Sequence, residues 1–135
     1  MKSSLNHLQV NVKPDNLPFY ADLTKFLGWS TIYEGDGMLG VGAETGPSLW
    51  FTSATKGSGN DYDGPGVNHI GIGVATQADV DEAAQYLAEL TVEPLFGTPC
   101  HRPEFAASEK DTYYQVMFES PDRVLFEVVY TGPKG

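Results

Sequence analysis

The sequence predicts an α+β fold in which a single domain, residues 1–135, consists of two β-α-β-β-β modules. Two observations favour this fold. Residues 6–12 (NHLQVNV) and 68–74 (NHIGIGV) are nearly alike, and similar segments far apart in a chain indicate a duplicated structural unit. Each segment is followed by one helical pattern and then by short strand patterns. We expect the modules to be related by a pseudo-twofold axis, with sheets that curve around a shared cavity.

The first module is predicted to span about residues 5–55. Its first strand alternates apolar Leu8, Val10 and Val12 with polar side chains, which is typical of a strand with two different faces. Apolar residues then recur at helical spacing as far as Gly28, which can end a helix. Short strand patterns follow, separated by glycine-containing turns. The remaining predicted elements are a helix at 17–27 and strands at 31–34, 38–42 and 48–53.

The second module is predicted at about residues 67–131, after a glycine-rich linker at 56–66. It repeats the order of the first module. A proline-containing loop at 97–111 holds Cys100 and His101. The predicted elements are a strand at 67–75, an amphipathic helix at 79–90, a strand at 91–96 and a hairpin of strands at 113–118 and 124–130.

The composition limits the classes of function. A net charge of −10 with only eight Lys and Arg argues against nucleic acid and anionic membranes as partners. An acidic surface can attract a cationic ligand, but it can equally be a solvated face. The single cysteine, Cys100, excludes an intramolecular disulfide and a multi-cysteine metal cluster. The N-terminal residues lack a signal-peptide pattern and no segment is apolar enough to cross a bilayer, so we expect a cytoplasmic protein.

The polar faces of the repeated strands carry the candidate chemistry. His7, Gln9 and Asn11 share the polar face of the first strand, and His69 holds the matching position beside glycines that leave room for a ligand. Glu127 lies in an otherwise apolar strand and requires a partner. Two imidazoles and one carboxylate commonly bind iron(II), zinc and related divalent metals. Solvent-exposed histidines and an ion pair of the glutamate with a basic side chain are the plainer alternatives.

Four segments carry a wider similarity: residues 6–8 (NHL), 19–29 with its FY and FLGW, 67–71 (VNHIG), and 118–128 with its FESPD and LFEV. Through them the chain resembles the vicinal oxygen chelate superfamily, which includes glyoxalase I, fosfomycin-resistance proteins, extradiol dioxygenases and bleomycin-resistance proteins. The similarity extends over essentially the whole chain.

The resemblance implies a metal centre in the shared cavity. In metal-dependent members the ligands lie on the first strand of each module and on the last strand of the second module. These positions are occupied here by His7, His69 and Glu127. The resemblance implies a divalent metal ion, and iron, zinc, manganese, nickel and cobalt all remain open because these ligand types accept each of them.

Two departures from the family narrow the implied function. Glyoxalase I has a further glutamate or glutamine on the last strand of its first module, where the repeat places Phe51. Phenylalanine cannot ligate a metal or transfer a proton, so the resemblance favours a three-ligand centre over a glyoxalase I isomerase. Fosfomycin-resistance enzymes surround their ligand with several cations, whereas the predicted cavity is poor in cations.

Further side chains are expected to face the substrate. If the alternate residues of strand 113–118 pack in the core, Tyr113, Gln115 and Met117 face the metal. His101, in the preceding loop, carries an imidazole, a group that often serves as an acid or base, and is a second candidate for that role, although a surface histidine is an equal alternative. The predicted catalytic residues are His101 and Tyr113, and the predicted substrate-binding residues are Gln9, Asn11, Phe51, Gln115 and Met117.

Two classes of function remain open. The first is an enzyme that binds two vicinal oxygens of a small oxygen-rich molecule to a divalent metal and works as a dioxygenase, lyase or isomerase. The second is a bleomycin-resistance type of protein, with an absent or vestigial metal site, that sequesters a bulky cationic drug. The complete ligand set favours the enzyme. The resemblance also implies a homodimer, because many relatives pair through exchanged or facing modules.

Overall fold

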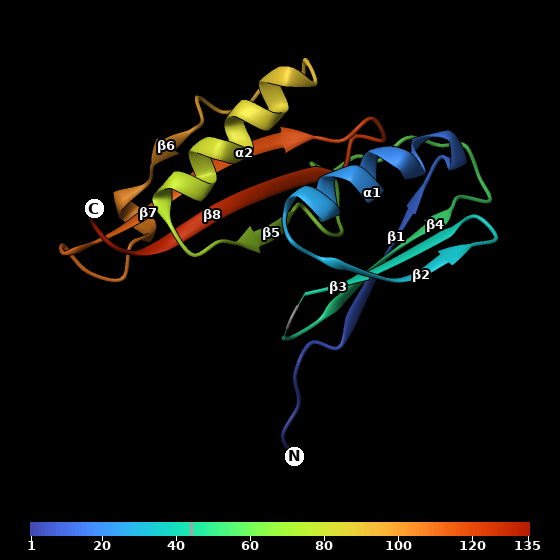
Figure 1. The fold of residues 1–135 in the computed structure, drawn as a ribbon, viewed down its shortest axis with the longest axis horizontal. Helices are drawn as coiled ribbons and strands as arrows, with labels where there is room; N and C mark the ends of the chain where they lie inside the picture. Colours follow the sequence, from blue (N-terminus) through green and yellow to red (C-terminus); the bar gives the residue numbers. More distant parts are fainter. Residues whose placement is uncertain (44) are drawn as a thin grey trace. The chain divides into compact units, whose positions relative to one another are not determined.

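The computed structural model describes residues 1–43 and 45–135. The chain forms two compact units, residues 1–59 and 60–135. In the described residues each unit contains one α-helix and a four-stranded sheet, in the order β-α-β-β-β (Figure 1). The predicted α+β fold with two such modules is therefore confirmed.

The first unit contains the sheet β1-β4-β3-β2. Strand β1 runs parallel to β4, and the other neighbours are antiparallel. Its core forms where the apolar sides of the strands meet the helix, because alternate strand residues and every third or fourth helix residue face the same way. The elements are β1 (His7–Val12), a 3-10 turn (Pro14–Asn16), α1 (Leu17–Phe26), β2 (Ser30–Gly35), β3 (Met38–Gly42) and β4 (Ser48–Ser53).

The second unit contains the sheet β5-β8-β7-β6, with α2 packed against β7 and β8 (Figure 1). A capping box between Thr76 and Asp79 starts the helix, and Val80, Ala83 and Leu87 are buried on its inner face. The elements are β5 (Ile70–Gly73), α2 (Gln77–Glu89), β6 (Cys100–His101), a 3-10 turn (Pro103–Phe105), β7 (Asp111–Glu119) and β8 (Leu125–Pro133).

The two sheets repeat one topology, because β5 pairs with β8 in parallel as β1 pairs with β4. The register repeats as well. Gln9 lies opposite Trp50 in the first sheet, and Gly71 lies opposite Glu127 in the second. This register identifies which residues of the two modules hold equivalent positions.

The predicted strand at 91–96 is wrong. Thr91 and Phe96 adopt positive φ angles of 59° and 58°, and such left-handed residues interrupt an extended chain. The strand next to β7 is instead β6 (Cys100–His101), which the sequence analysis placed in a loop. The correction matters for the site, because β6 sets the direction of the side chains around Arg102.

No helix in the described part of the chain combines the length and the apolar character that a membrane span requires.

Candidate metal centre and pocket

His69 and Glu127, two of the three predicted metal ligands, lie together in the second unit. Glu127 is in β8 and only 3% exposed, while His69 directly precedes β5, the parallel neighbour of β8. The Nε2 atom of His69 is 3.1 Å from Oε2 of Glu127. A parallel strand pair thus brings together an imidazole and a carboxylate that are far apart in the sequence.

Asn68 determines which nitrogen of His69 carries the proton. Its Nδ2 donates to the backbone carbonyl of Tyr62 at 2.9 Å, which orients the amide so that Oδ1 faces Nδ1 of His69 at 2.8 Å. Since Oδ1 can only accept, Nδ1 must donate, and a neutral imidazole then presents a lone pair at Nε2. That lone pair faces a carboxylate oxygen of Glu127. Two such acceptors at this distance repel each other unless a cation, either a proton or a metal ion, lies with them.

The pair fits a divalent transition metal. Nitrogen and oxygen ligands lie about 2.1 Å from such metals, so two of them are about 3.0 Å apart in octahedral coordination and about 3.4 Å apart in tetrahedral coordination. The observed 3.1 Å is close to the octahedral spacing and equals that of a direct hydrogen bond between a protonated imidazole and the carboxylate. His7, the third predicted ligand, belongs to the first unit. Among the residues that the structure describes, no three His, Cys, Asp or Glu side chains form a cluster suited to a metal.

The second oxygen of Glu127 is held by two donors. The hydroxyl of Tyr113 donates to Oε1. The Nε2 atom of Gln115 also donates to Oε1, at 3.2 Å, when the amide is oriented with its nitrogen toward Glu127 and its oxygen toward Arg102. Burial, together with the hydrogen bond and the charge of Glu127, raises the pKa of Tyr113 to about 12. The phenol is therefore protonated at neutral pH and remains a donor. These bonds leave Oε2 as the carboxylate oxygen directed at His69.

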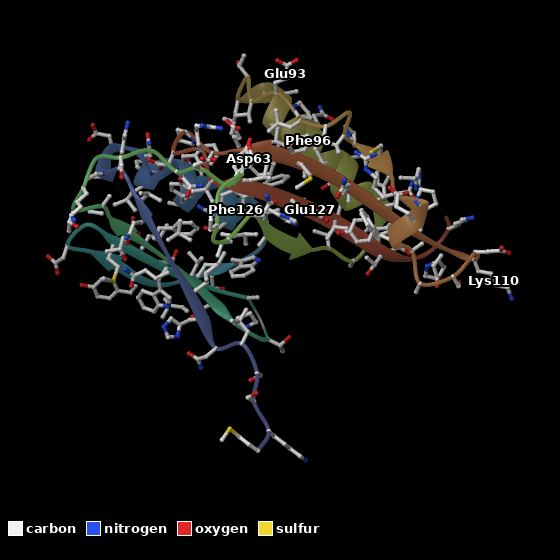
Figure 2. The ribbon with its side chains drawn as sticks, turned by 180° about the vertical axis from the view of Figure 1, so that it is seen from behind. Asp63, Glu93, Phe96, Lys110, Phe126 and Glu127 are labelled. Carbon is white, nitrogen blue, oxygen red and sulfur yellow. The ribbon has the colours of Figure 1, made fainter. Side chains whose placement is uncertain are left out.

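A pocket of about 570 Å³ opens beside this pair. Figure 2 shows Phe96 and Glu127, which contribute to its lining from a loop and from β8. Most of the lining is aromatic, apolar or amide-bearing, and three charged side chains complete it. The lining residues are His69, Phe96, Arg102, Glu104, Phe105, Tyr113, Gln115, Met117 and Glu127.

Sequence reasoning placed Tyr113, Gln115 and Met117 on the metal side, and all three line the pocket with His69 and Glu127. It missed the contributions of residues 96–105. These residues were divided between a wrongly predicted strand and a loop, so their side-chain directions could not be assigned. A correctly placed β6 would have assigned Arg102 to the pocket. Cys100 pairs with Gln115, and Arg102, two residues further on, points to the same face of the sheet.

His101, predicted as an acid or base, does not line this pocket. It pairs with Tyr114 across β6 and β7, and the two rings are 4.5 Å apart. Its Nδ1 contacts Oγ1 of Thr112, while the Tyr114 hydroxyl donates to Asp81 of α2 at 2.7 Å. His101 therefore follows the helix-covered side of β7, and Tyr113, on the other side, is the candidate that faces the pocket.

In the first unit, Phe51 is a core residue rather than part of a ligand site. It is fully buried and stacks on Tyr20 of α1 with ring centroids 4.4 Å apart. The register shows that the position equivalent to Glu127 is Trp50, one residue earlier than the sequence analysis placed it. Tryptophan has no carboxylate either, so this position still carries no acidic ligand of the glyoxalase I kind.

The polar face of β1 borders a smaller pocket of about 310 Å³. His7 and Gln9 line it with Asn6, Ser48 and Trp50, whereas Asn11 is not part of the lining but accepts a hydrogen bond from Gln9 at 3.3 Å. The Nδ1 atom of His7 lies 2.7 Å from Oδ1 of Asn6, which repeats the contact between His69 and Asn68.

No protein-family model matches the chain, and no curated protein matches its sequence. Solved structures do match it. A Bacillus halodurans protein with a proposed glyoxalase assignment superposes with a TM-score of 0.76 at 24% identity, over 93% of this chain and 94% of that one. A glyoxalase/bleomycin resistance protein from Albidiferax ferrireducens gives 0.72 at 13% identity, over 93% and 98%.

A further match is the fosfomycin resistance protein FosX from Listeria monocytogenes, solved with Mn(II) and a sulfate ion. Its TM-score is 0.67 at 23% identity, over 95% of this chain and 90% of that chain. Each of these similarities extends over nearly the whole of both chains. The chain thus has the fold of the glyoxalase/bleomycin resistance/dioxygenase proteins, as the resemblance to the vicinal oxygen chelate superfamily predicted.

Proposed function

We propose that this protein is a divalent-metal-dependent enzyme that binds two vicinal oxygens of a small oxygen-rich molecule. The observation that most supports this function is the His69–Glu127 pair, whose facing acceptor atoms require a cation. His7 is the proposed third ligand, on the basis of the repeated Asn-His pair. The manganese in the FosX structure supports metal use within this fold.

The proposed reaction is of the dioxygenase, lyase or isomerase type. A bound metal would polarise the substrate oxygens and stabilise negative charge that develops on them. Tyr113 and Gln115 would hold Glu127 in the orientation that ligation requires. The Tyr113 hydroxyl also borders the pocket, where it can donate to a substrate oxygen. Phe96, Phe105 and Met117 provide apolar walls that exclude water from the rest of the substrate.

Within this class the site favours chemistry with three protein ligands. Trp50 occupies the position that would supply a second carboxylate in the first module. An indole cannot move a proton between two substrate carbons. We therefore place dioxygenase and lyase reactions ahead of a glyoxalase I isomerisation.

The first test is the metal content of protein purified without chelator, measured by elemental mass spectrometry. We expect about one metal ion per chain in the wild type and almost none in His69→Ala, Glu127→Ala and His7→Ala. His101→Ala is the matched control, since its imidazole lies outside the pocket, and it should keep its metal. Iron would indicate oxygen chemistry, whereas zinc, manganese, nickel or cobalt would indicate Lewis-acid chemistry. A wild type that contains no metal and takes none from added salts would contradict the proposal.

The second candidate function is metal-independent sequestration of a bulky cationic drug. The aromatic walls formed by Phe96, Phe105 and Tyr113, together with the net charge of −10, favour it. Isothermal titration of chelator-treated protein with metal-free bleomycin distinguishes the two. Tight binding without metal would support sequestration, and binding that is absent without metal would support the enzyme.

We also propose that the protein is a homodimer, as the family resemblance implies. Size-exclusion chromatography with light scattering should give twice the 14.7 kDa mass of one chain. A mass of one chain at micromolar concentration would contradict this part of the proposal.

A further inference from the structure

Arg102 contributes a cation to the second-unit pocket, which the sequence analysis expected to be poor in cations. Its Nη2 donates to the carbonyl of Phe96 at 2.8 Å. Its Nε donates to Oε1 of Gln115 at 3.2 Å in the amide orientation that also lets Gln115 donate to Glu127. Arg102 takes part in neither of the ion pairs found among the described residues. These two bonds leave most of the five guanidinium N–H donors available to a ligand.

The backbone holds this side chain in place. The amide of Arg102 donates to the carbonyl of Tyr113 at 2.8 Å, which continues the β6–β7 pairing by one residue. The contacts to Phe96 and Gln115 then fix two of the guanidinium nitrogens. A guanidinium held in this way loses little additional entropy when it binds a ligand.

Arg102 is connected to the His69–Glu127 pair through the side-chain amide of Gln115. Gln115 accepts from Arg102 with one end and donates to Glu127 with the other, both at 3.2 Å. The guanidinium and the ligating carboxylate are therefore separated by the amide group of one glutamine. A small molecule in this pocket can therefore lie against the Arg102 guanidinium and the His69–Glu127 pair at the same time.

The charges of the pocket favour an anion once a metal is bound. Glu104 and Glu127 outnumber Arg102 among the Asp, Glu, Lys and Arg side chains that line the metal-free pocket. A divalent cation would reverse this balance and leave a net positive pocket. The positive charge would then be divided between the metal at one end and the guanidinium at the other.

We propose that Arg102 binds an anionic group of the substrate. The substrate class is then a small, largely apolar acid, with two vicinal oxygens at one end and a carboxylate or phosphoryl group at the other. The apolar body lies against Phe96, Phe105 and Met117. This inference rests on the proposed function for the metal end, whereas the anion site depends on Arg102 alone.

Isothermal titration of Zn(II)-loaded protein tests the proposal with two probes that share a vicinal diol. 3,4-Dihydroxybenzoate carries a carboxylate, and 4-methylcatechol is its neutral counterpart of similar size. A charge-assisted hydrogen bond corresponds to about a 10-fold or larger gain in affinity, so the wild type should prefer dihydroxybenzoate by at least that ratio. Arg102→Gln should abolish the preference by weakening the binding of dihydroxybenzoate far more than that of 4-methylcatechol. Glu104→Gln, the matched control in the same pocket, should keep or increase it.

Equal affinities of the wild type for the two probes, or an unchanged ratio in Arg102→Gln, would overturn the proposal. If Arg102→Gln melts at a lower temperature than the wild type, Arg102→Lys replaces it and should retain a reduced preference.

Failure of the proposed function can be recognised separately, because 4-methylcatechol binding would then not depend on zinc. In that event benzoate and phenylphosphonate are titrated into the metal-free protein. Binding of either that Arg102→Gln removes supports the anion site, and its absence overturns it. Tighter binding of benzoate would identify the anionic group as a carboxylate, and tighter binding of phenylphosphonate would identify it as a phosphoryl group.

Discussion

At the scale of single residues, an asparagine precedes each of the two repeated histidines and contacts its Nδ1, at 2.7 Å in the first unit and 2.8 Å in the second. An amide oxygen in this position keeps the proton on Nδ1 and leaves Nε2 free to ligate a metal. Under the proposed function, Asn6 and Asn68 would act through the histidines rather than on a substrate. The sequence showed the repeat, but the role of its first residue became visible only in the hydrogen bonds.

We predict that Asn68→Leu lowers zinc affinity by about 10- to 100-fold, because His69 loses the partner that fixes its tautomer and orientation. Asn68→Asp keeps an acceptor oxygen and should bind zinc at least as tightly as the wild type. Competition with a chromogenic chelator measures both affinities. Thermal unfolding of the metal-free variants serves as the control, since the bond from Asn68 to Tyr62 is also lost. An unchanged affinity in Asn68→Leu would show that the asparagine has no influence on the ligand.

A second residue-scale prediction concerns Phe51, which stacks on Tyr20 and has no exposed surface. Phe51→Leu should reduce the free energy of unfolding by about 1 to 2 kcal/mol, because a buried ring is replaced by a smaller side chain. The zinc affinity of the folded protein should not change. Urea unfolding and chelator competition on the same sample check both results. A loss of zinc affinity with unchanged stability would contradict the core assignment.

At the scale of elements, the first sheet has no counterpart of the glutamate in the second. Trp50 lies across Gly40 of the neighbouring strand β3, and its indole nitrogen donates to Oγ of Ser48 at 3.0 Å. A Cβ atom on Gly40 would lie only 2.5 Å from the indole ring. The lack of a side chain at Gly40 therefore leaves the space that the Trp50 indole occupies.

We predict that Gly40→Ala destabilises the protein by about 1 to 3 kcal/mol, since either the indole or the strand must move. Gly73→Ala in β5 is the matched control, because a Cβ there meets no atom within 4 Å. Its free energy of unfolding should stay close to the wild-type value. Urea denaturation of the three proteins measures the differences. Similar values for both variants would mean that the indole does not constrain β3.

At the scale of the whole molecule, alkaline pH should weaken the fold through two neighbouring tyrosines. The pKa of Tyr113 is raised to about 12, first by burial and then by Glu127. The pKa of Tyr114 is also raised to about 12, chiefly by its hydrogen bond to Asp81. In the unfolded chain both phenols have the usual tyrosine pKa of about 10. The folded state therefore retains protons that the unfolded state releases.

It follows that this contribution to stability is complete below about pH 10 and is lost as the pH rises toward 12. Urea unfolding of chelator-treated protein at several pH values from 9 to about 11.5 measures the loss. The double variant Tyr113→Phe, Tyr114→Phe should show a shallower decline over this range. A decline as steep as that of the wild type would assign the pH dependence to other groups.

The order of elements was predictable because it depends on local patterns. Strand alternation, helical spacing and glycine turns identified all five elements of the first module and four of the five in the second, and β3 and β4 have the predicted bounds. The prediction for residues 91–101 was wrong because their conformation depends on contacts with β7. The amide of Leu95 donates to Met117 in that strand, and the left-handed residues nearby leave no sequence pattern.

The sequence by itself determined the duplicated β-α-β-β-β fold, the repeated Asn-His pair at the start of each module, and Glu127 as a charge in an apolar strand. These follow from periodicities of the chain and from the cost of burying a carboxylate. Only the tertiary structure decided that Trp50 is the counterpart of Glu127, that His101 lies off the pocket and that Arg102 lines it. Such assignments depend on strand register, and a shift of one residue turns a side chain to the opposite face of its sheet.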